Sequence, residues 1–455
     1  MPLLSAFILI FLQVAAAPPP PNVIIVFTDD QGYGDVGVYG ATEFRTPNLD
    51  RMAREGARFT DFYVAAPVCT PSRAALLTGS HPVRVGLGHR VLFPYSKTGL
   101  HTDEITLAEL LKQQGYSTGM IGKWHLGHHE KFLPTRQGFD SYFGIPYSND
   151  MGNHRYARED FTAPPLPILR NEEAVEYQPD QNLLTRRYTE EAVRFIETNK
   201  KKPFFLYVPH SMPHWPLAAS SRFAGRSKLG IYGDAIEEID WSVGEILRAL
   251  KDQGIDDRTL VIFTTDNGAS LRPWQRRGYR SGSNGPLRGD KNTTWEGGMR
   301  VPAIMRWPGQ IPAGLVQGEL ATAMDILPTV AKLAGTEAPT DRILDGKDIW
   351  PLMSGQQGAK TPHDAFYYYR DERLQAVRSG EWKLHVYRPN WEEDAAQHKP
   401  LLFNLDSDIG ERNNVAANHP DVVKRLEALA EHARKDLGDA ATGRKGRNLR
   451  PVGTL

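Results

Sequence analysis

The sequence contains a single cysteine, Cys69, among its 455 residues. One thiol excludes an intramolecular disulfide and every zinc or iron–sulfur site that needs several cysteines. An excess of one charge is also absent, because 54 Lys and Arg residues balance 54 Asp and Glu residues. A neutral chain has no global field that would attract nucleic acid or an anionic membrane, so any recognition of an anion has to be local.

Long apolar segments are missing after the first residues, so the sequence predicts no membrane span in the mature protein. Residues 1–17 have an apolar core that ends in Ala-x-Ala, the pattern of a signal peptide. We therefore expect a periplasmic or secreted protein. With 40% hydrophobic and 24% charged residues, the composition is that of a folded globular chain.

Three short apolar runs, at residues 23–27, 204–208 and 259–263, each stop at polar residues. Continuous apolar runs of this length are typical of strands buried on both faces of a parallel sheet. Between them lie helical periods at residues 106–114, 188–198, 235–250 and 323–333. The alternation predicts an α/β fold, with a large, mostly parallel mixed sheet flanked by helices.

The pattern changes near residue 364. Alternating runs at residues 365–369, 374–377, 382–387 and 401–405 predict a smaller antiparallel sheet, and a helix is expected over 421–437. We expect a larger domain over residues 22–363, a C-terminal subdomain of sheet and helix over 364–440, and a flexible basic tail over 441–455.

Carboxylates follow two of the predicted strands. Asp29 and Asp30 end the first, and Asp266 and Asn267 end another. Ligands of parallel sheets lie at the carboxyl ends of the strands, where these side chains would converge. Three carboxylates repel one another unless a cation joins them, and oxygen donors favour calcium, with magnesium as the alternative. The other interpretation is that both pairs are turn and cap residues.

Cys69 lies just before a predicted helix that starts near Pro71. A helix N-terminus and the nearby cation of Arg73 would stabilise a thiolate. The alternative is a buried, inert thiol.

The sequence from Cys69 through Pro71 and Arg73, followed by Ala-Ala-Leu-Leu-Thr-Gly, resembles the signature of the type I sulfatases, the family that includes arylsulfatase A. The resemblance covers residues 22–413. It includes the segments at residues 46–50, 122–127, 213–216, 266–268 and 289–298, and the ending at 402–414. It implies an alkaline-phosphatase-like fold, with residues 22–363 as the catalytic domain.

The resemblance also implies a mechanism for cleaving a sulfate monoester. A formylglycine-generating enzyme oxidises Cys69 to Cα-formylglycine, and a hydroxyl of the hydrated aldehyde attacks sulfur. It implies that the metal is bound by Asp29, Asp30, residue 69, Asp266 and Asn267. It also implies that Arg73 holds the hydrate and that Lys123 and Lys291 stabilise the sulfate oxygens. His214 protonates the leaving oxygen and also contacts the substrate. His125 then removes the proton of the second hydroxyl, which releases inorganic sulfate.

The residues themselves leave some of these roles open. Lys123 and His125 are alternate residues after an apolar run, so on an extended segment they would face the same side. A solvated surface pair is the alternative. His210 lies four residues before His214 and is a second candidate for the acid.

The substrate is less clearly encoded. Four arginines, including Arg276 and Arg277, alternate with Trp274 and Tyr279 over residues 272–280, a pattern that suits subsites for a sulfated sugar and equally a solvated basic loop. A second wall is expected over residues 142–156, with Asn149, Asp150, Asn153, His154 and Arg155. The alternative functions are a phosphoester or phosphonate ester hydrolase of the same superfamily and a non-catalytic protein that binds sulfated glycans. The position of the sulfate, exo or endo action, the oligomeric state and conversion of Cys69 in the host stay open.

Overall fold

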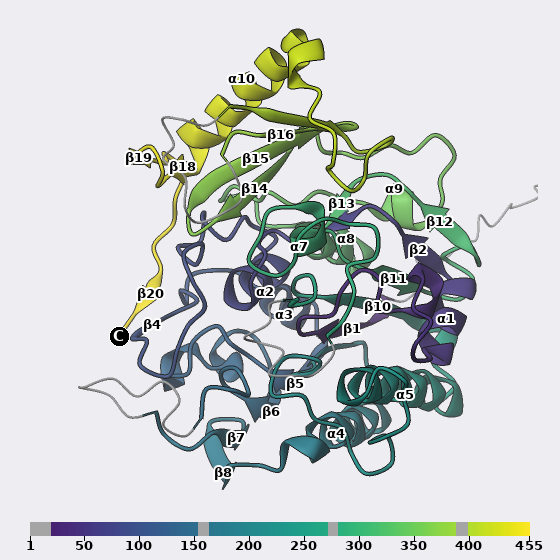
Figure 1. Cartoon of the computed structure of the whole chain (residues 1–455). Coiled ribbons are helices and arrows are strands. Elements are labelled where there is room, and N and C mark those ends of the chain that lie inside the picture. Colours follow the sequence, from purple (N-terminus) through teal and green to yellow (C-terminus); the bar gives the residue numbers. More distant parts are fainter. Residues whose placement is uncertain (1–19, 153–162, 272–280, 388–398) are drawn as a thin grey trace, which may run out of the picture.

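The computed structural model describes residues 20–152, 163–271, 281–387 and 399–455. The predicted signal peptide over residues 1–17 lies outside this part of the chain. The larger domain is built on a 10-stranded sheet in the order β12-β2-β11-β10-β1-β9-β5-β6-β7-β8 (Figure 1). Its strands are β1 (Asn22–Thr28), β2 (Ala57–Phe59), β5 (Ser117–Lys123), β6 (Ser141–Ile145), β7 (Pro167–Arg170), β8 (Glu173–Tyr177), β9 (Phe204–Pro209), β10 (Thr259–Thr265), β11 (Ala303–Arg306) and β12 (Leu315–Gln317).

The centre of this sheet is parallel, whereas antiparallel pairs occur towards both ends. β1 pairs in parallel with β10 and with β9, and β5 pairs in parallel with β9 and with β6. β11 and β7 run in the opposite direction to their inner neighbours. The predicted mostly parallel mixed sheet is therefore confirmed, and the three apolar runs of the sequence are its adjacent strands β10, β1 and β9.

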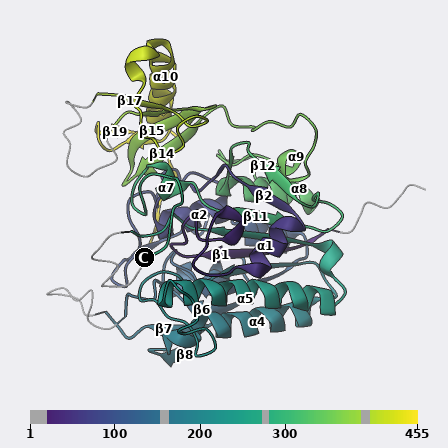
Figure 2. The same ribbon diagram turned by 45° about the vertical axis from the view of Figure 1, so that its right-hand side comes forward.

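Helices cover both faces of the sheet. They are α1 (Pro47–Arg54), α2 (Cys69–Thr78), α3 (Leu107–Gln113), α4 (Leu184–Asn199), α5 (Ile231–Asp252) and α8 (Ile326–Leu333), with the short α7 (Glu296–Met299) and α9 (Trp350–Met353). Figure 2 shows α4 and α5 together on one side of the sheet. In the described part of the chain, no helix is both long and apolar enough to cross a membrane.

Successive residues of β1 pack against different helical layers, because strand side chains alternate between the two faces. Val23, Ile25 and Phe27 belong to the core that includes α2, α3 and α8. Ile24 and Val26 belong to the core that includes α1, α4 and α5. Burial on both faces is the reason that β1 is apolar from Val23 to Phe27.

The C-terminal subdomain has the predicted antiparallel sheet and helix. β14 (Phe366–Arg370), β15 (Arg373–Ser379), β16 (Trp382–His385) and β17 (Leu401–Asn404) pair in that order, and α10 (Pro420–Asp436) packs on β15 and β16. In Figure 2 this sheet lies on the opposite side of the molecule from α4 and α5. Phe366, Tyr368 and Ala376 join the core under α2 and α8, so the two parts share apolar contacts.

The last residues do not form the frayed tail that we expected over 441–455. β20 (Gly453–Thr454) pairs with β4 (Thr98–Gly99) of the larger domain, and β19 (Arg444–Lys445) pairs with β18 (Gly438–Asp439). Arg450 donates to Glu104 at 2.7 and 3.0 Å. Arg450 thus has a buried acidic partner and also donates to the backbone carbonyl of Ile343, which corrects the prediction.

Candidate active site

Four polar side chains converge where β1 and β10 end. Asp29 and Asp30 follow the last residue of β1, and Asp266 and Asn267 follow the last residue of β10, which is its parallel neighbour. The backbone N–H of Asp30 donates to Asp266 Oδ1 at 3.1 Å, and Asn267 Nδ2 donates to Asp30 Oδ1 at 2.8 Å. All four are buried. The strand-end prediction is right about this convergence.

The carboxyl groups of this cluster differ in pKa. Burial and the neighbouring Asp29 carboxylate raise the pKa of Asp266 to about 7. Burial also opposes the ionisation of Asp29, but the cations around it, first Lys123, outweigh burial and hold the pKa of Asp29 well below its ordinary value. The three carboxylates of this cluster therefore face three buried basic residues, Arg73, Lys123 and Lys291.

The residues fit a hard divalent cation. Asn267 Oδ1 is buried and has no hydrogen-bond partner among the described residues, although buried oxygens of native proteins nearly always have one. An oxygen beside three carboxylates, with no donor of its own, matches the ligand preference of calcium or magnesium.

A second set of possible metal-ligand atoms lies around Cys69. Ligand atoms of Asp29, Asp30, Cys69 and His214 all lie within 4.8 Å of one another. Three of these four belong to the predicted metal set, and His214 does not. Of the two other predicted ligands, Asp266 and Asn267, Asp266 already accepts from Arg73 through Oδ2 at 2.8 Å and from the N–H of Asp30.

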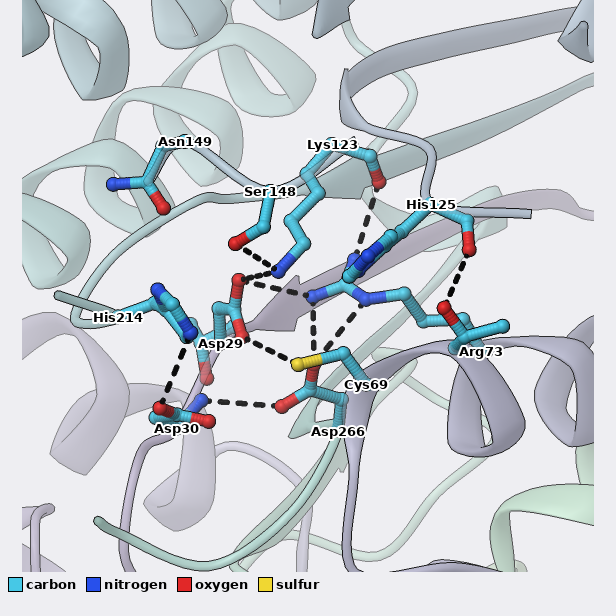
Figure 3. Close-up of polar contacts among 12 residues, drawn as sticks. Asp29, Asp30, Cys69, Arg73, Lys123, His125, Ser148, Asn149, His214 and Asp266 are labelled. Atoms are coloured by element: carbon cyan, nitrogen blue, oxygen red, sulfur yellow. Dashed lines mark hydrogen bonds and ion pairs between the residues drawn. The ribbon is translucent and has the colours of Figure 1, made fainter. Parts of the chain in front are cut away.

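Cys69 is the first residue of α2 and is almost fully buried. Its Sγ lies 3.4 Å from Asp29 Oδ1 and 3.6 Å from Lys291 Nζ. Figure 3 shows the sulfur directed at the carboxylates of Asp29 and Asp266. Burial, and then the charges of Asp266 and Asp29, raise the pKa of the Cys69 thiol well above its ordinary value.

Our prediction that Arg73 stabilises a thiolate is therefore wrong. The guanidinium of Arg73 is fully buried and donates to Asp266 through Nε and Nη2, at 3.2 and 2.8 Å. Its Nη1 donates to the carbonyl of Lys123 at 3.2 Å. The hydrogen bonds of Arg73 therefore go to Asp266 and to the backbone at Lys123.

Lys123 is the last residue of β5. Its Nζ lies 2.5 Å from Asp29 Oδ2 and donates to Ser148 Oγ at 3.1 Å. Ser148 lies within the predicted second wall over residues 142–156 but was not named there, and it follows the end of β6, the parallel neighbour of β5. The same strand-end rule that found Asp29 could have found it.

His125 reaches the site by a different route from the one we predicted. The strand ends at Lys123, and the backbone of His125 has a left-handed φ of 62°, so the two residues are not alternate positions of one extended segment. Figure 3 nevertheless shows both side chains at the site, with the His125 ring beside Arg73. His125 Nε2 lies 2.9 Å from the carbonyl of Leu92, and its buried Nδ1 has no partner in the described structure. Burial, then the charges of Lys123 and Arg73, lower the pKa of His125 well below its ordinary value.

The two histidines after β9 point in different directions. His214 Nε2 lies 3.8 Å from Asp30 Oδ2, and its Nδ1 lies 2.5 Å from the carbonyl of Trp215. His210 is fully buried, and its Nε2 lies 3.2 Å from Ser242 Oγ on α5. Of the two, His214 is the one beside the carboxylates. Burial, and next the charge of Lys291, lower the pKa of His214.

Lys291 completes the site from a loop after β10. Its Nζ lies 2.7 Å from Asp30 Oδ1 and is largely buried. Of the predicted second wall, Asn149 is held by Gln181, which accepts from Asn149 Nδ2 at 2.9 Å, and Asp150 is half-buried. The remaining predicted substrate residues, Asn153, His154, Arg155, Arg276 and Arg277, lie outside the described residues.

A cysteine at a helix N-terminus, two lysines and a carboxylate cluster at the strand ends of a parallel sheet define an α/β ester hydrolase of the alkaline-phosphatase-like type. Residues 21–336 match the family model "Sulfatase", and residues 361–447 match "C-terminal region of aryl-sulfatase". The chain belongs to the sulfatase family, and it is a sulfuric ester hydrolase.

The chain is similar over most of its length to curated sulfatases and to solved sulfatase structures. N-acetylgalactosamine-6-sulfatase from Canis lupus familiaris is 41% identical over 454 residues, which cover 90% of this chain and 85% of the relative. Arylsulfatase A from Homo sapiens is 41% identical over 442 residues, or 89% and 86% of the two chains. The crystal structure of Ps i-CgsB in complex with k-i-k-neocarrahexaose matches with a TM-score of 0.77 and 32% identity. The match covers 91% of this chain and 92% of the Ps i-CgsB chain.

Proposed function

We propose that this sulfatase hydrolyses sulfate monoesters of carbohydrates, with Cys69 converted to Cα-formylglycine. The observation that carries the proposal is the position of Cys69, whose sulfur faces Asp29 and Lys291 in a buried cluster of carboxylates and cations. The hydrated aldehyde supplies one hydroxyl that attacks sulfur and a second whose proton can be removed to release sulfate. An unmodified thiol with a raised pKa is a poor nucleophile at neutral pH, which favours the conversion.

The proposed metal is calcium, with magnesium as the alternative. Asp29, Asp30, Asp266, Asn267 and residue 69 would hold it, and it would neutralise charge on the sulfate oxygens. The partnerless Oδ1 of Asn267 supports this role. Arg73 keeps Asp266 in place beside that site through two hydrogen bonds.

The two lysines are proposed to bind the sulfate oxygens. Lys291 Nζ lies 3.6 Å from Cys69 Sγ, and Lys123 approaches from the far side of Asp29. Charges fixed around the position of the reacting ester stabilise the charge that redistributes over its oxygens in the transition state. Both ammonium groups are already placed by Asp29 and Asp30, so binding requires little reorganisation.

His125 is proposed as the base. The Leu92 carbonyl can only accept a hydrogen bond, so Nε2 of His125 carries the proton and Nδ1 of the neutral ring carries the lone pair. The lowered pKa keeps the ring neutral at physiological pH, and the unpartnered Nδ1 is available to accept a proton.

His214 is proposed as the acid that protonates the leaving oxygen. By the same reasoning the Trp215 carbonyl fixes the proton on Nδ1, so Nε2 is the atom that exchanges a proton on the side of Asp30. A lowered pKa makes protonated His214 a stronger acid. The direction of its ring favours it over His210.

A sulfated sugar is the proposed substrate. The N-acetylgalactosamine-6-sulfatase relative is named for a sugar sulfate, and Ps i-CgsB was solved with a carrahexaose. The predicted arginine and aromatic subsites at residues 272–280 stay part of this proposal. So do export to the periplasm or medium and maturation by a formylglycine-generating enzyme.

The proposal is tested on protein co-expressed with a formylglycine-generating enzyme. Mass analysis of the peptide containing Cys69 is expected to show an aldehyde in place of the thiol, and 4-nitrophenyl sulfate is expected to be cleaved far faster than the phosphate. A panel of sulfated saccharides and a steroid sulfate then defines the substrate. A persistent thiol despite an active converting enzyme would refute the mechanism and favour a protein that only binds glycans.

A further inference from the structure

Lys291 lies on a loop that is fixed from two sides. The loop consists of residues 288–296 and is called the Lys291 loop below. On the side of the large sheet, the backbone N–H of Lys291 donates to the carbonyl of Ala269 at 3.1 Å, and the N–H of Asn292 donates to that of Pro67 at 2.9 Å. These bonds tie the middle of the loop to the segments that carry Asn267 and Cys69.

The other side of the loop is held by the C-terminal subdomain. Lys383 on β16 donates from Nζ to the carbonyl of Thr294 at 2.9 Å. Glu411, which follows β17, accepts the backbone N–H of Glu296 through Oε2 at 2.7 Å. Two backbone groups close after Lys291 thus have partners from a part of the chain that matches a separate family model.

These contacts form one buried network. Lys383 Nζ lies 2.8 Å from Glu296 Oε1 and 2.9 Å from Glu411 Oε1, and all three residues are fully buried. His385 Nε2 lies 2.8 Å from the same oxygen of Glu411. Removing one charge from such a network leaves the others uncompensated, so each member constrains the rest.

Glu411 also holds the start of the loop. Arg288 donates from Nη1 to the backbone carbonyl of Glu411 at 2.7 Å, and its guanidinium carbon lies 3.7 Å above the ring of Trp295. Thr294 donates from Oγ1 to Gln375 Oε1 on β15 at 2.9 Å. Both ends of the Lys291 loop therefore contact the C-terminal subdomain, while its centre reaches Asp30.

We propose that Glu411 and Lys383 are positioning residues that set the place of the Lys291 ammonium in the active site. The inference rests on the proposed function, in which Lys291 binds sulfate oxygens. A charge that must meet the transition state loses much of its effect when it is displaced by about 1 Å. The C-terminal subdomain, which provides none of the proposed catalytic residues, would then contribute to catalysis through the loop that it anchors.

The test variant is Glu411→Gln. Both carboxylate oxygens of Glu411 accept hydrogen bonds, from Glu296 N–H on one side and from Lys383 and His385 on the other. The amide of Gln has the same shape but must direct an NH2 group at one of these donors. We expect kcat/KM for an aryl sulfate to fall about tenfold in the metal-loaded, formylglycine-containing enzyme.

A double-mutant cycle with Lys291→Ala separates positioning from a general effect. If Glu411 acts through Lys291, adding Glu411→Gln to Lys291→Ala lowers kcat/KM by less than about twofold. Inhibition by inorganic sulfate gives a second measure, because Glu411→Gln is expected to weaken sulfate binding only while Lys291 is present. Equal losses in both backgrounds, or no loss in the parent enzyme, would overturn the inference.

The matched control is Asp436→Asn. Asp436 on α10 also joins the C-terminal subdomain to the larger domain, through an ion pair of 2.6 Å with Arg84, but it does not contact the Lys291 loop. It is expected to lower the melting temperature and to show no coupling with Lys291→Ala. If Glu411→Gln does not fold, Gln375→Leu weakens the same anchor without a buried charge. If Lys291→Ala alone leaves turnover unchanged, the proposed role of Lys291 fails, and the inference fails with it.

Discussion

Lys123 Nζ lies 2.5 Å from Asp29 Oδ2, and neither side chain is exposed to solvent. The ion pair joins the end of β5 to the end of β1, two strands that are separated in the sheet by β9. It therefore fixes a cation across the carboxyl edge of the sheet, where the proposed sulfate site lies.

Replacing this cation tests its proposed role. Lys123→Ala is expected to lower turnover of an aryl sulfate at least about a hundredfold, because a preorganised charge in a buried site lowers the activation barrier by several kcal/mol. Lys112→Ala, which removes a half-exposed partner of Asp140, is the control and is expected to leave turnover unchanged. Similar turnover in the parent enzyme and in Lys123→Ala would contradict the assignment.

The leaving group distinguishes the two histidines. His214→Ala is expected to slow the hydrolysis of an alkyl or sugar sulfate about a hundredfold or more. The hydrolysis of a nitrophenyl sulfate is expected to slow much less, because a good leaving group needs little protonation. His210→Ala is expected to show no such dependence, since its Nε2 faces Ser242. Steady-state rates over a series of leaving groups measure the difference. The same dependence in both variants would reopen the choice of acid.

Cation binding is expected to stabilise the folded protein. Calcium at about a hundred times its dissociation constant adds about 2.7 kcal/mol of stability if it binds only the folded state. Asn267→Ala removes the partnerless oxygen and is expected to abolish most of the rise in melting temperature after calcium is added to chelated protein. The control is Asn418→Ala, because Asn418 is exposed. A rise of equal size in Asn267→Ala would argue against this ligand, and a larger rise with magnesium would argue against calcium.

Stability is expected to depend on pH through a carboxyl group far from the sulfate site. Asp240 on α5 accepts the N–H groups of Asn48 and Leu49 at the start of α1, at 3.0 and 2.8 Å. Burial raises the pKa of Asp240 to about 6. The folded state therefore binds this proton more tightly than the unfolded state, whose pKa is about 3.9. Its contribution is complete below about pH 4 and is lost as the pH rises through 6.

Asp240→Asn removes this titration. The stability of the parent protein relative to the variant is expected to fall by on the order of 2 kcal/mol between pH 4 and pH 7. Urea unfolding of both proteins at the two pH values measures the change, and the pH dependence shared by all other groups cancels in the comparison. A difference that stays constant or increases with pH would show that the Asp240 pKa is not raised.

Most of the fold follows from local sequence patterns. The run at residues 23–27 is apolar at every position because β1 is buried by helices on both faces, so its type and its burial could both be predicted. The strand β15 of the C-terminal sheet is buried on both faces, by α10 and by the core under α2 and α8. The tail could not be predicted, since its composition resembles that of a solvated segment while Arg450 has its partner, Glu104, 346 residues away.

The site could be predicted only as far as strand ends and motifs define it. Asp29 and Asp266 meet because parallel neighbours end at the same edge of the sheet. The partner of Arg73 could not be predicted, because the direction of a guanidinium depends on a carboxylate 193 residues later in the chain. The contact of His125 with Leu92 likewise depends on a single left-handed residue that no periodicity reveals.

The place of β1 between β9 and β10 also determines when this strand can pair during synthesis of the chain. The first strand of the sheet has no neighbour until residues 204–209 and 259–265 have been made. Between Cys69 and the end of β10 the ribosome adds roughly 200 residues, which takes about 10 to 40 s at ordinary rates of elongation. During that interval the nascent chain lacks the strands β9 and β10, so the converting enzyme of our proposal would reach Cys69 before the sheet closes.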